Sequence, residues 1–81
     1  MKKGRFTLPR SFVLDQDIVV KRIMSQCIIV RAQMIYVSDV IEYQAISWRF
    51  RDVPDHEIMP TYVWTYDTET GELIVEERGY E

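Results

Sequence analysis

The sequence contains few of the residues from which catalytic and metal centres are built. Among its 81 residues there are one cysteine, one histidine and three scattered glycines. One cysteine and one histidine cannot complete a four-ligand zinc site, and the glycines do not form a phosphate-binding loop. No serine stands in a nucleophile-elbow context. We therefore expect no metal, no cofactor, no catalytic residue and no enzymatic activity.

Long apolar runs are also missing. No stretch approaches the roughly 20 apolar residues that a membrane-spanning helix needs. The basic start, MKKGRF, is followed by Pro9, Arg10 and Asp15, which leave no signal-peptide core. The single Cys27 has no internal disulfide partner, which is typical of a reducing compartment. These features predict a cytoplasmic protein without a membrane partner. Cys27 lies on an apolar stripe at helical spacing, so we expect it to be a buried, unreactive thiol.

The net charge of −3 hides an uneven distribution along the chain. Residues 1–31 carry seven Lys or Arg and two Asp, a balance of +5, whereas residues 32–81 carry a balance of −8. Such a chain could pair head to tail with copies of itself, or its charges could intermix once it folds. The acidic excess disfavours nucleic acid as a partner. A domain this short buries a modest core, so self-association is a common source of added stability.

Two hairpins are predicted. In residues 62–77, Asp67 can accept hydrogen bonds from turn amides and Gly71 supplies a positive φ, which places Tyr66 opposite Leu73. In residues 28–48, a tight turn at Ser38-Asp39 would place Met34 opposite Tyr43. The Ser-Asp pair is a weaker turn signal than Asn-Gly, so this second register is open to a shift.

The remaining segments complete an α+β prediction. Residues 15–26 have an apolar stripe at helical spacing, although Ile18-Val19-Val20 would also suit a strand. Residues 1–14 are expected to form an extended arm or edge strand because Pro9 cannot donate to a central ladder. Residues 49–61 form an irregular loop. The sequence thus predicts one small domain, a twisted antiparallel sheet of four to five strands with one short helix packed on one face.

The segment ISWRFRDVPDHEIMPTYVW, residues 46–64, concentrates the most distinctive side chains. Tryptophan, tyrosine and arginine are enriched at binding hot spots, and arginine with an aromatic ring suits a phosphate-bearing aromatic ligand. The alternative is that Tyr62 and Trp64 complete the core while the arginines keep the strand edge soluble. The predicted ligand-binding set is Trp48, Arg49, Arg51, His56, Tyr62 and Trp64.

Three functional hypotheses follow. The chain resembles, in size and style only, the small orphan proteins with which phages and mobile elements block host systems. This favours a non-enzymatic, self-associating binding protein that captures a small anionic ligand, such as a cyclic nucleotide, between subunits. A second hypothesis is an inhibitor that docks on a host protein through an open sheet edge or an acidic hairpin carrying Glu69, Glu72 and Glu76. A third is an enzyme using His56 with Asp52 or Glu57 as an acid–base pair.

Overall fold

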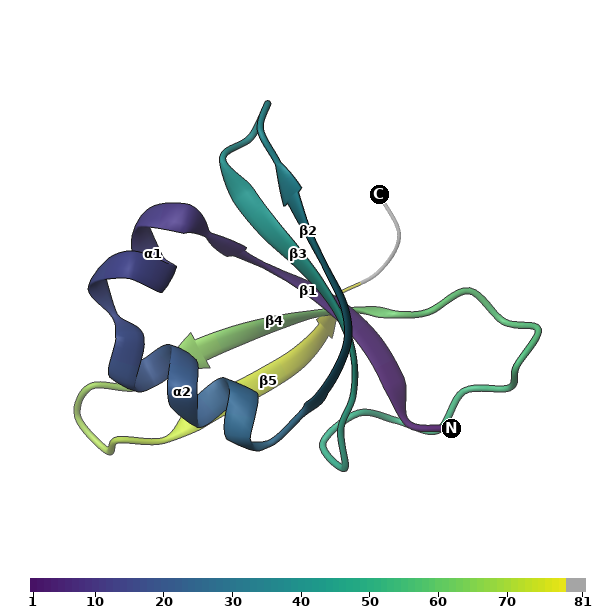
Figure 1. Cartoon of the computed structure of the whole chain (residues 1–81). Coiled ribbons are helices and arrows are strands. Elements are labelled where there is room, and N and C mark those ends of the chain that lie inside the picture. The colour runs from purple at the N-terminus through teal and green to yellow at the C-terminus, as the bar shows by residue number, and fades with distance from the viewer. Residues whose placement is uncertain (79–81) are drawn as a thin grey trace.

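A computed structural model describes residues 1–78, which form a five-stranded sheet and two short helices (Figure 1). The strands lie side by side in the order β2-β3-β1-β4-β5, and both helices pack on the same side of the sheet. The elements in chain order are β1 (Lys3–Pro9), α1 (Arg10–Asp15), α2 (Asp17–Ser25), β2 (Ile28–Ile35), β3 (Val40–Ile46), β4 (Thr61–Tyr66) and β5 (Leu73–Arg78).

The N-terminal strand lies at the centre of the sheet, so its prediction as an arm or edge strand is wrong. β1 pairs with β3 on one side and with β4 on the other. Pro9 is the last residue of β1, so its missing amide hydrogen affects only the end of the ladder. Alternate residues of the strand, Gly4, Phe6 and Leu8, are buried, which is the pattern of a central strand with one core face.

The α+β class is confirmed, but the sheet is mixed rather than purely antiparallel. β1 and β4 run parallel, with Arg5 opposite Thr61, while the other strand pairs are antiparallel. There are two helices instead of one. Gln16 leaves the helical conformation (φ −116°, ψ 48°) and separates α1 from α2. The helical interpretation of residues 15–26 is confirmed by α2, which buries Val19, Val20 and Ile23 against the sheet.

The two hairpins differ in how well their registers follow the prediction. In β4–β5, Tyr66 faces Leu73 and Trp64 faces Val75, as predicted. In β2–β3, Met34 faces Ile41 rather than Tyr43, a shift of two residues. The turn spans residues 36–39 instead of a tight Ser-Asp pair, and a bulge interrupts the ladder between residues 29 and 31.

An aromatic cluster in the core joins the two hairpins across the short β1–β4 contact. Phe6 of β1 stacks on Tyr43 of β3, with ring centroids 5.3 Å apart, and meets Trp64 of β4 edge-on at 5.8 Å. Phe50, from the β3–β4 loop, stacks on Tyr62 at 4.2 Å. Aromatic pairs at these separations add to the stabilisation from burial, so the cluster holds the halves of the sheet together.

Gly4 makes room for the Phe50–Tyr62 stack. A Cβ atom added at Gly4 would lie 2.5 Å from Tyr62 Cε2 and 3.0 Å from Phe50 Cδ2. These distances are shorter than van der Waals contact, and both neighbours are held by their mutual stacking. Glycine is therefore required here by the close approach of two rings rather than by its backbone angles.

Candidate functional site

Five of the six residues of the predicted ligand-binding set fall into two groups, and His56 belongs to neither. Trp48, Arg49 and Trp64 lie together, because the Arg49 guanidinium carbon is 5.7 Å from the Trp48 ring centre and 5.5 Å from that of Trp64. Arg51 and Tyr62 form the second group, since the Arg51 amide donates to the Tyr62 hydroxyl at 3.0 Å.

Arg49 is fixed by hydrogen bonds within the protein. Its Nη1 donates to Gln26 Oε1 at 2.9 Å and its Nη2 donates to the Leu73 carbonyl at 2.8 Å. Its backbone amide donates to the hydroxyl of Ser47, which in turn donates to the Gln26 carbonyl. Both terminal nitrogens have protein acceptors, so Arg49 is held in place, where it makes cation–π contacts with the Trp48 and Trp64 rings.

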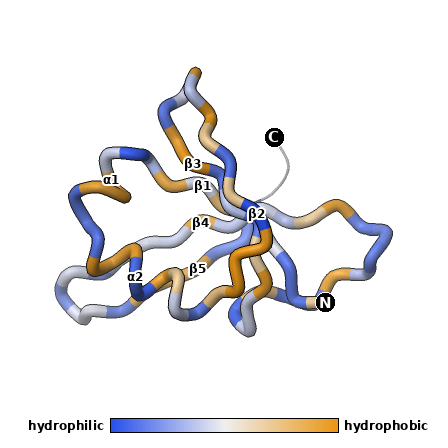
Figure 2. The backbone as a smooth tube through the Cα atoms, viewed as in Figure 1, coloured by the Kyte–Doolittle hydropathy of each residue, from blue (hydrophilic) through white to orange (hydrophobic). Residues whose placement is uncertain are grey.

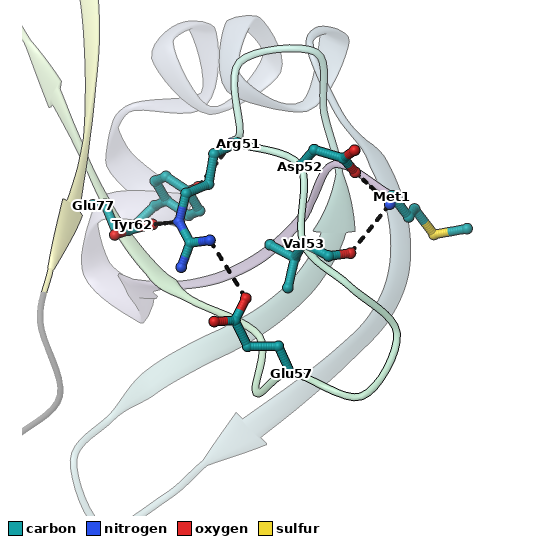
Figure 3. Close-up of polar contacts among 7 residues, drawn as sticks. All are labelled: Met1, Arg51, Asp52, Val53, Glu57, Tyr62 and Glu77. Atoms are coloured by element: carbon teal, nitrogen blue, oxygen red, sulfur yellow. Dashed lines mark hydrogen bonds and ion pairs between the residues drawn. The ribbon is translucent and has the colours of Figure 1, made fainter.

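Arg51 ties the β3–β4 loop to β5 (Figure 3). Its Nε donates to Glu77 and its Nη1 donates to Glu57 Oε2 at 3.5 Å. The hydrogen bond to Glu77, with smaller contributions from both carboxylates' charges, raises the pKa of Arg51. These carboxylates already balance the guanidinium charge, so Arg51 offers a phosphate group less attraction than a free arginine would.

The histidine-based enzyme hypothesis finds little geometric support. His56 is exposed, and it makes no hydrogen bond or ion pair within residues 1–78. Asp52 forms an ion pair with the Met1 amino group, whose hydrogen bond lowers the pKa of that carboxyl (Figure 3). Glu57 is engaged by Arg51. Both proposed acid–base partners of His56 are therefore occupied elsewhere.

An open pocket of about 240 Å³ lies beside Trp48. It sits where the end of α2 and the start of β2 meet the end of β3. Trp48 is 71 % exposed and Ile28 is 68 % exposed. The residues lining the pocket are Ser25, Gln26, Cys27, Ile28, Ile46, Ser47 and Trp48.

Cys27 is a poor nucleophile in this pocket. Burial raises the pKa of its thiol, against smaller opposing effects of Ser47 and the Arg49 charge. A thiol with a raised pKa carries less reactive thiolate near neutral pH. In the described part of the chain no three His, Cys, Asp or Glu residues are grouped to hold a metal ion. The pocket is thus suited to noncovalent contact.

The acidic residues proposed to bind a partner are exposed. Glu69, Glu72 and Glu76 form no ion pair with any residue from 1 to 78. Asp67 in the same hairpin has a different role, because its carboxylate accepts hydrogen bonds from the Glu69 and Thr70 amides. These bonds lower the pKa of Asp67 and fix the turn in which Gly71 adopts φ 75°.

The charge separation along the sequence is partly cancelled in space. Arg10 pairs with Asp39 at 2.9 Å, and Arg22 donates to the Gly71 carbonyl in the acidic hairpin. The Met1 amino group pairs with Asp52. Two of the positive groups of the N-terminal third therefore lie against acidic residues of the remainder.

Sequence reasoning missed three residues of this region. Phe50 was treated as part of an irregular loop, yet it is only 2 % exposed and packs on Tyr62 and Trp64. Ile28 and Ile46 line the pocket, and only the strand pairing of these two residues brings them together. The core alternative for Tyr62 and Trp64 is supported by the same ring contacts, although Trp64 Nε1 is buried without a hydrogen-bond partner among residues 1–78.

No helix of the described chain is long and apolar enough to span a membrane. Comparisons with protein-family models, with curated protein sequences and with solved structures gave no match.

Proposed function

We propose that this chain is a non-enzymatic, self-associating binding protein whose main contact surface is the Trp48 pocket. The observation that carries the proposal is the 71 % exposure of Trp48, next to Arg49, whose side chain is held by two hydrogen bonds. Leaving a large aromatic ring in water costs free energy, which contact with a ligand or partner would recover.

The lining of the pocket defines what it can contact. Ile28, Ile46 and the Trp48 ring supply apolar surface, while Ser25 and Gln26 supply polar groups at the rim. Binding sites typically combine such apolar walls with a few polar groups that orient the ligand. An aromatic or aliphatic group of a ligand or partner fits this lining best.

The proposed ligand class is a small phosphate-bearing aromatic molecule, such as a cyclic nucleotide. The exposed face of Trp48 can stack on a base, and the Arg49 guanidinium 5.7 Å away provides positive charge. Arg49 and Arg51 already donate hydrogen bonds to acceptors within the protein. Stacking on Trp48, rather than hydrogen bonds from these arginines to the phosphate, would therefore supply most of the affinity.

Isothermal calorimetry against a panel of linear and cyclic nucleotides tests this ligand class. We expect heat of binding from wild-type protein and its loss in Trp48→Ala. Leu14→Ala is the matched control, because Leu14 is similarly exposed but lies on α1, away from the pocket lining. Absence of heat with every nucleotide, at protein concentrations well above micromolar, would exclude the nucleotide version.

The second candidate is an inhibitor that docks on a host protein through its acidic hairpin. It is supported by the unpaired, exposed carboxylates of Glu69, Glu72 and Glu76. It predicts binding to a basic protein surface that weakens steeply with salt and in the Glu72→Lys/Glu76→Lys variant. Affinity indifferent to both changes would count against it. The phage-type role, which depends on the size and style of the chain, and the cytoplasmic location, which depends on its single cysteine, belong to the proposal as well.

A further inference from the structure

The outer edge of β2 is unusually apolar for an unpaired strand. β2 is the terminal strand of the sheet, and its first six residues are exposed. Ile28 and Val30 at its start are 68 % and 65 % exposed, and Figure 2 shows this hydrophobic stretch next to the β2 label. The turn at its other end presents Tyr36, 84 % exposed, and a fully exposed Val37. Long apolar edges of this kind are templates for strand pairing.

The opposite edge of the sheet has the contrasting character. β5 carries Glu76, Glu77 and Arg78 in its second half, and the acidic turn residues Glu69 and Glu72 precede it. Charged residues along an edge strand disfavour pairing with another chain. A contact between β2 of one copy and β5 of the next would be heterologous and would build rings or open fibres rather than a two-fold dimer. Pairing between two β2 strands forms a closed dimer.

We propose that the occupant of this edge is a second copy of the chain, paired antiparallel along β2 about a two-fold axis at Ala32. The two five-stranded sheets then form one continuous sheet. This inference deepens the proposed function, because it specifies how the binding protein self-associates.

Geometry and charge select Ala32 as the centre. A two-fold axis normal to the sheet keeps each side chain on its own face of the sheet. Residues directly opposite each other share a face, so the axis must lie between two copies of the same residue. An axis at Arg31 would oppose two arginines, and one at Val30 would fall in the bulge between residues 29 and 31. An axis at Gln33 would oppose Arg31 to Ile35. Centring on Ala32 places the smallest side chain of β2 on the axis.

The same register is complementary in charge. It places Arg31 opposite Gln33 of the second copy, and Gln33 is itself paired with Glu42 on β3. The row across the interface therefore runs from Arg31 through Gln33 to Glu42 of the second copy, and symmetry repeats it. Arg31 already reaches Gln33 Oε1 within one chain, at 3.5 Å, which shows that its side chain extends along this face.

The register is also complementary in hydrophobicity. Antiparallel pairing brings the turn of the second copy, with Tyr36 and Val37, alongside the start of β2, where Ile28 and Val30 are exposed. The apolar turn of each copy therefore covers the apolar start of β2 in the other copy, and the two-fold axis makes this contact occur twice. The Trp48 pocket includes Ile28, so it would lie close to the subunit boundary.

Disulfide trapping tests the register directly. The full chain with Cys27→Ser and Ala32→Cys should form a disulfide-linked dimer rapidly under mild oxidation, since residues facing across an antiparallel pair have Cβ atoms about 4.5–5.5 Å apart. Cys27→Ser with Thr65→Cys is the matched control, because Thr65 is exposed on β4, away from this edge. Equal rates in the two variants would overturn the register.

Analytical ultracentrifugation tests the charge row. Arg31→Glu should weaken the dimer by about tenfold, because two symmetry-related rows become repulsive. The double variant Arg31→Glu/Glu42→Arg should restore it. A wild-type protein that is monomeric at every concentration, or an Arg31→Glu variant that dimerises like the wild type, would overturn the inference. A monomer that still binds nucleotide through Trp48 would overturn the dimer while leaving the proposed ligand site intact.

Discussion

The two hairpins at the edges of the sheet are similar in size but differ in what their side chains do. β4–β5 buries Tyr62 and Leu73 and is held to the rest of the protein by Arg49 and Arg51. In β2–β3, every residue of β3 is buried or half-buried, while β2 leaves six of its eight residues exposed. The large side chains of β4–β5 are therefore mostly buried and stabilise the fold, whereas those of β2 are exposed and available for contact with another molecule.

This difference indicates where a function can reside. Residues of the aromatic cluster and of β4–β5 have partners within the chain, so substituting them should mainly lower the stability of the fold. Residues around β2 and Trp48 have few partners, so changing them should mainly affect association.

Removing the Phe50 ring should be the most damaging change on the β4–β5 side. Phe50→Ala should lower the free energy of unfolding by about 3–5 kcal/mol, because it deletes a buried ring that stacks on Tyr62 and contacts Trp64. Urea unfolding followed by tryptophan fluorescence measures the loss. Tyr36→Ala, in the exposed β2–β3 turn, is the control and should change the stability of the dilute, monomeric protein by less than about 0.5 kcal/mol. Equal losses in the two variants would remove the contrast between the hairpins.

Filling the space at Gly4 should have the next largest effect. Gly4→Ala should destabilise the protein by about 1–3 kcal/mol, because the added methyl group would push the Tyr62 ring away from Phe50. The same urea titration measures it, and near-ultraviolet circular dichroism should show a changed aromatic signal. Wild-type stability in this variant would mean that the Tyr62 ring can move without cost and that the anchoring is weaker than the contacts indicate.

The two hairpins also differ in how far the sequence predicted them. The β4–β5 register follows from the Asp67 and Gly71 turn, because a side chain that caps turn amides and a positive-φ glycine act locally. In β2–β3 the turn is longer and Asp39, not a glycine, takes φ 54°. No local signal specified that turn, so the register was shifted by two residues.

Long-range features were the least predictable. β1 is central because β3 and β4, distant in sequence, pair on its two sides, and Pro9 alone suggested otherwise. The sequence predicts that Trp48, Arg49 and Trp64 belong to one binding set, but it does not predict how their side chains are arranged. Gln26 and the Leu73 carbonyl occupy the arginine donors, and both come from segments far from Arg49 in the chain. Only the folded arrangement reveals that these donors are in use.

A smaller, pH-dependent effect is expected at Asp67. Hydrogen bonds from the Glu69 and Thr70 amides lower the pKa of Asp67 from its usual 3.8, so its ionised form stabilises the fold. This contribution is present above the unfolded-state pKa and disappears as the pH falls through the lower folded-state value. The melting temperature of Asp67→Asn should therefore be below that of the wild type at about pH 7 and should approach it at about pH 2.

The control for this effect is Asp55→Asn, since the Asp55 carboxylate makes no hydrogen bond or ion pair within residues 1–78. Its difference from the wild type should be small at both pH values. A gap for Asp67→Asn that persists unchanged in acid would mean that the turn is held by something other than the Asp67 charge.

The smallest effect on stability is expected for a substitution on the exposed edge of β2, measured in dilute solution. Val30→Thr keeps the β-branched shape but makes the 65 % exposed side chain polar, so the stability of the monomer should change by less than about 0.5 kcal/mol. At high protein concentration the wild type alone should gain stability, because association stabilises the folded state by mass action. Melting temperatures at two concentrations, for both proteins, separate the effects. A large loss in dilute solution would show that β2 supports the fold of the single chain, and the division between an anchoring and a binding hairpin would then be wrong.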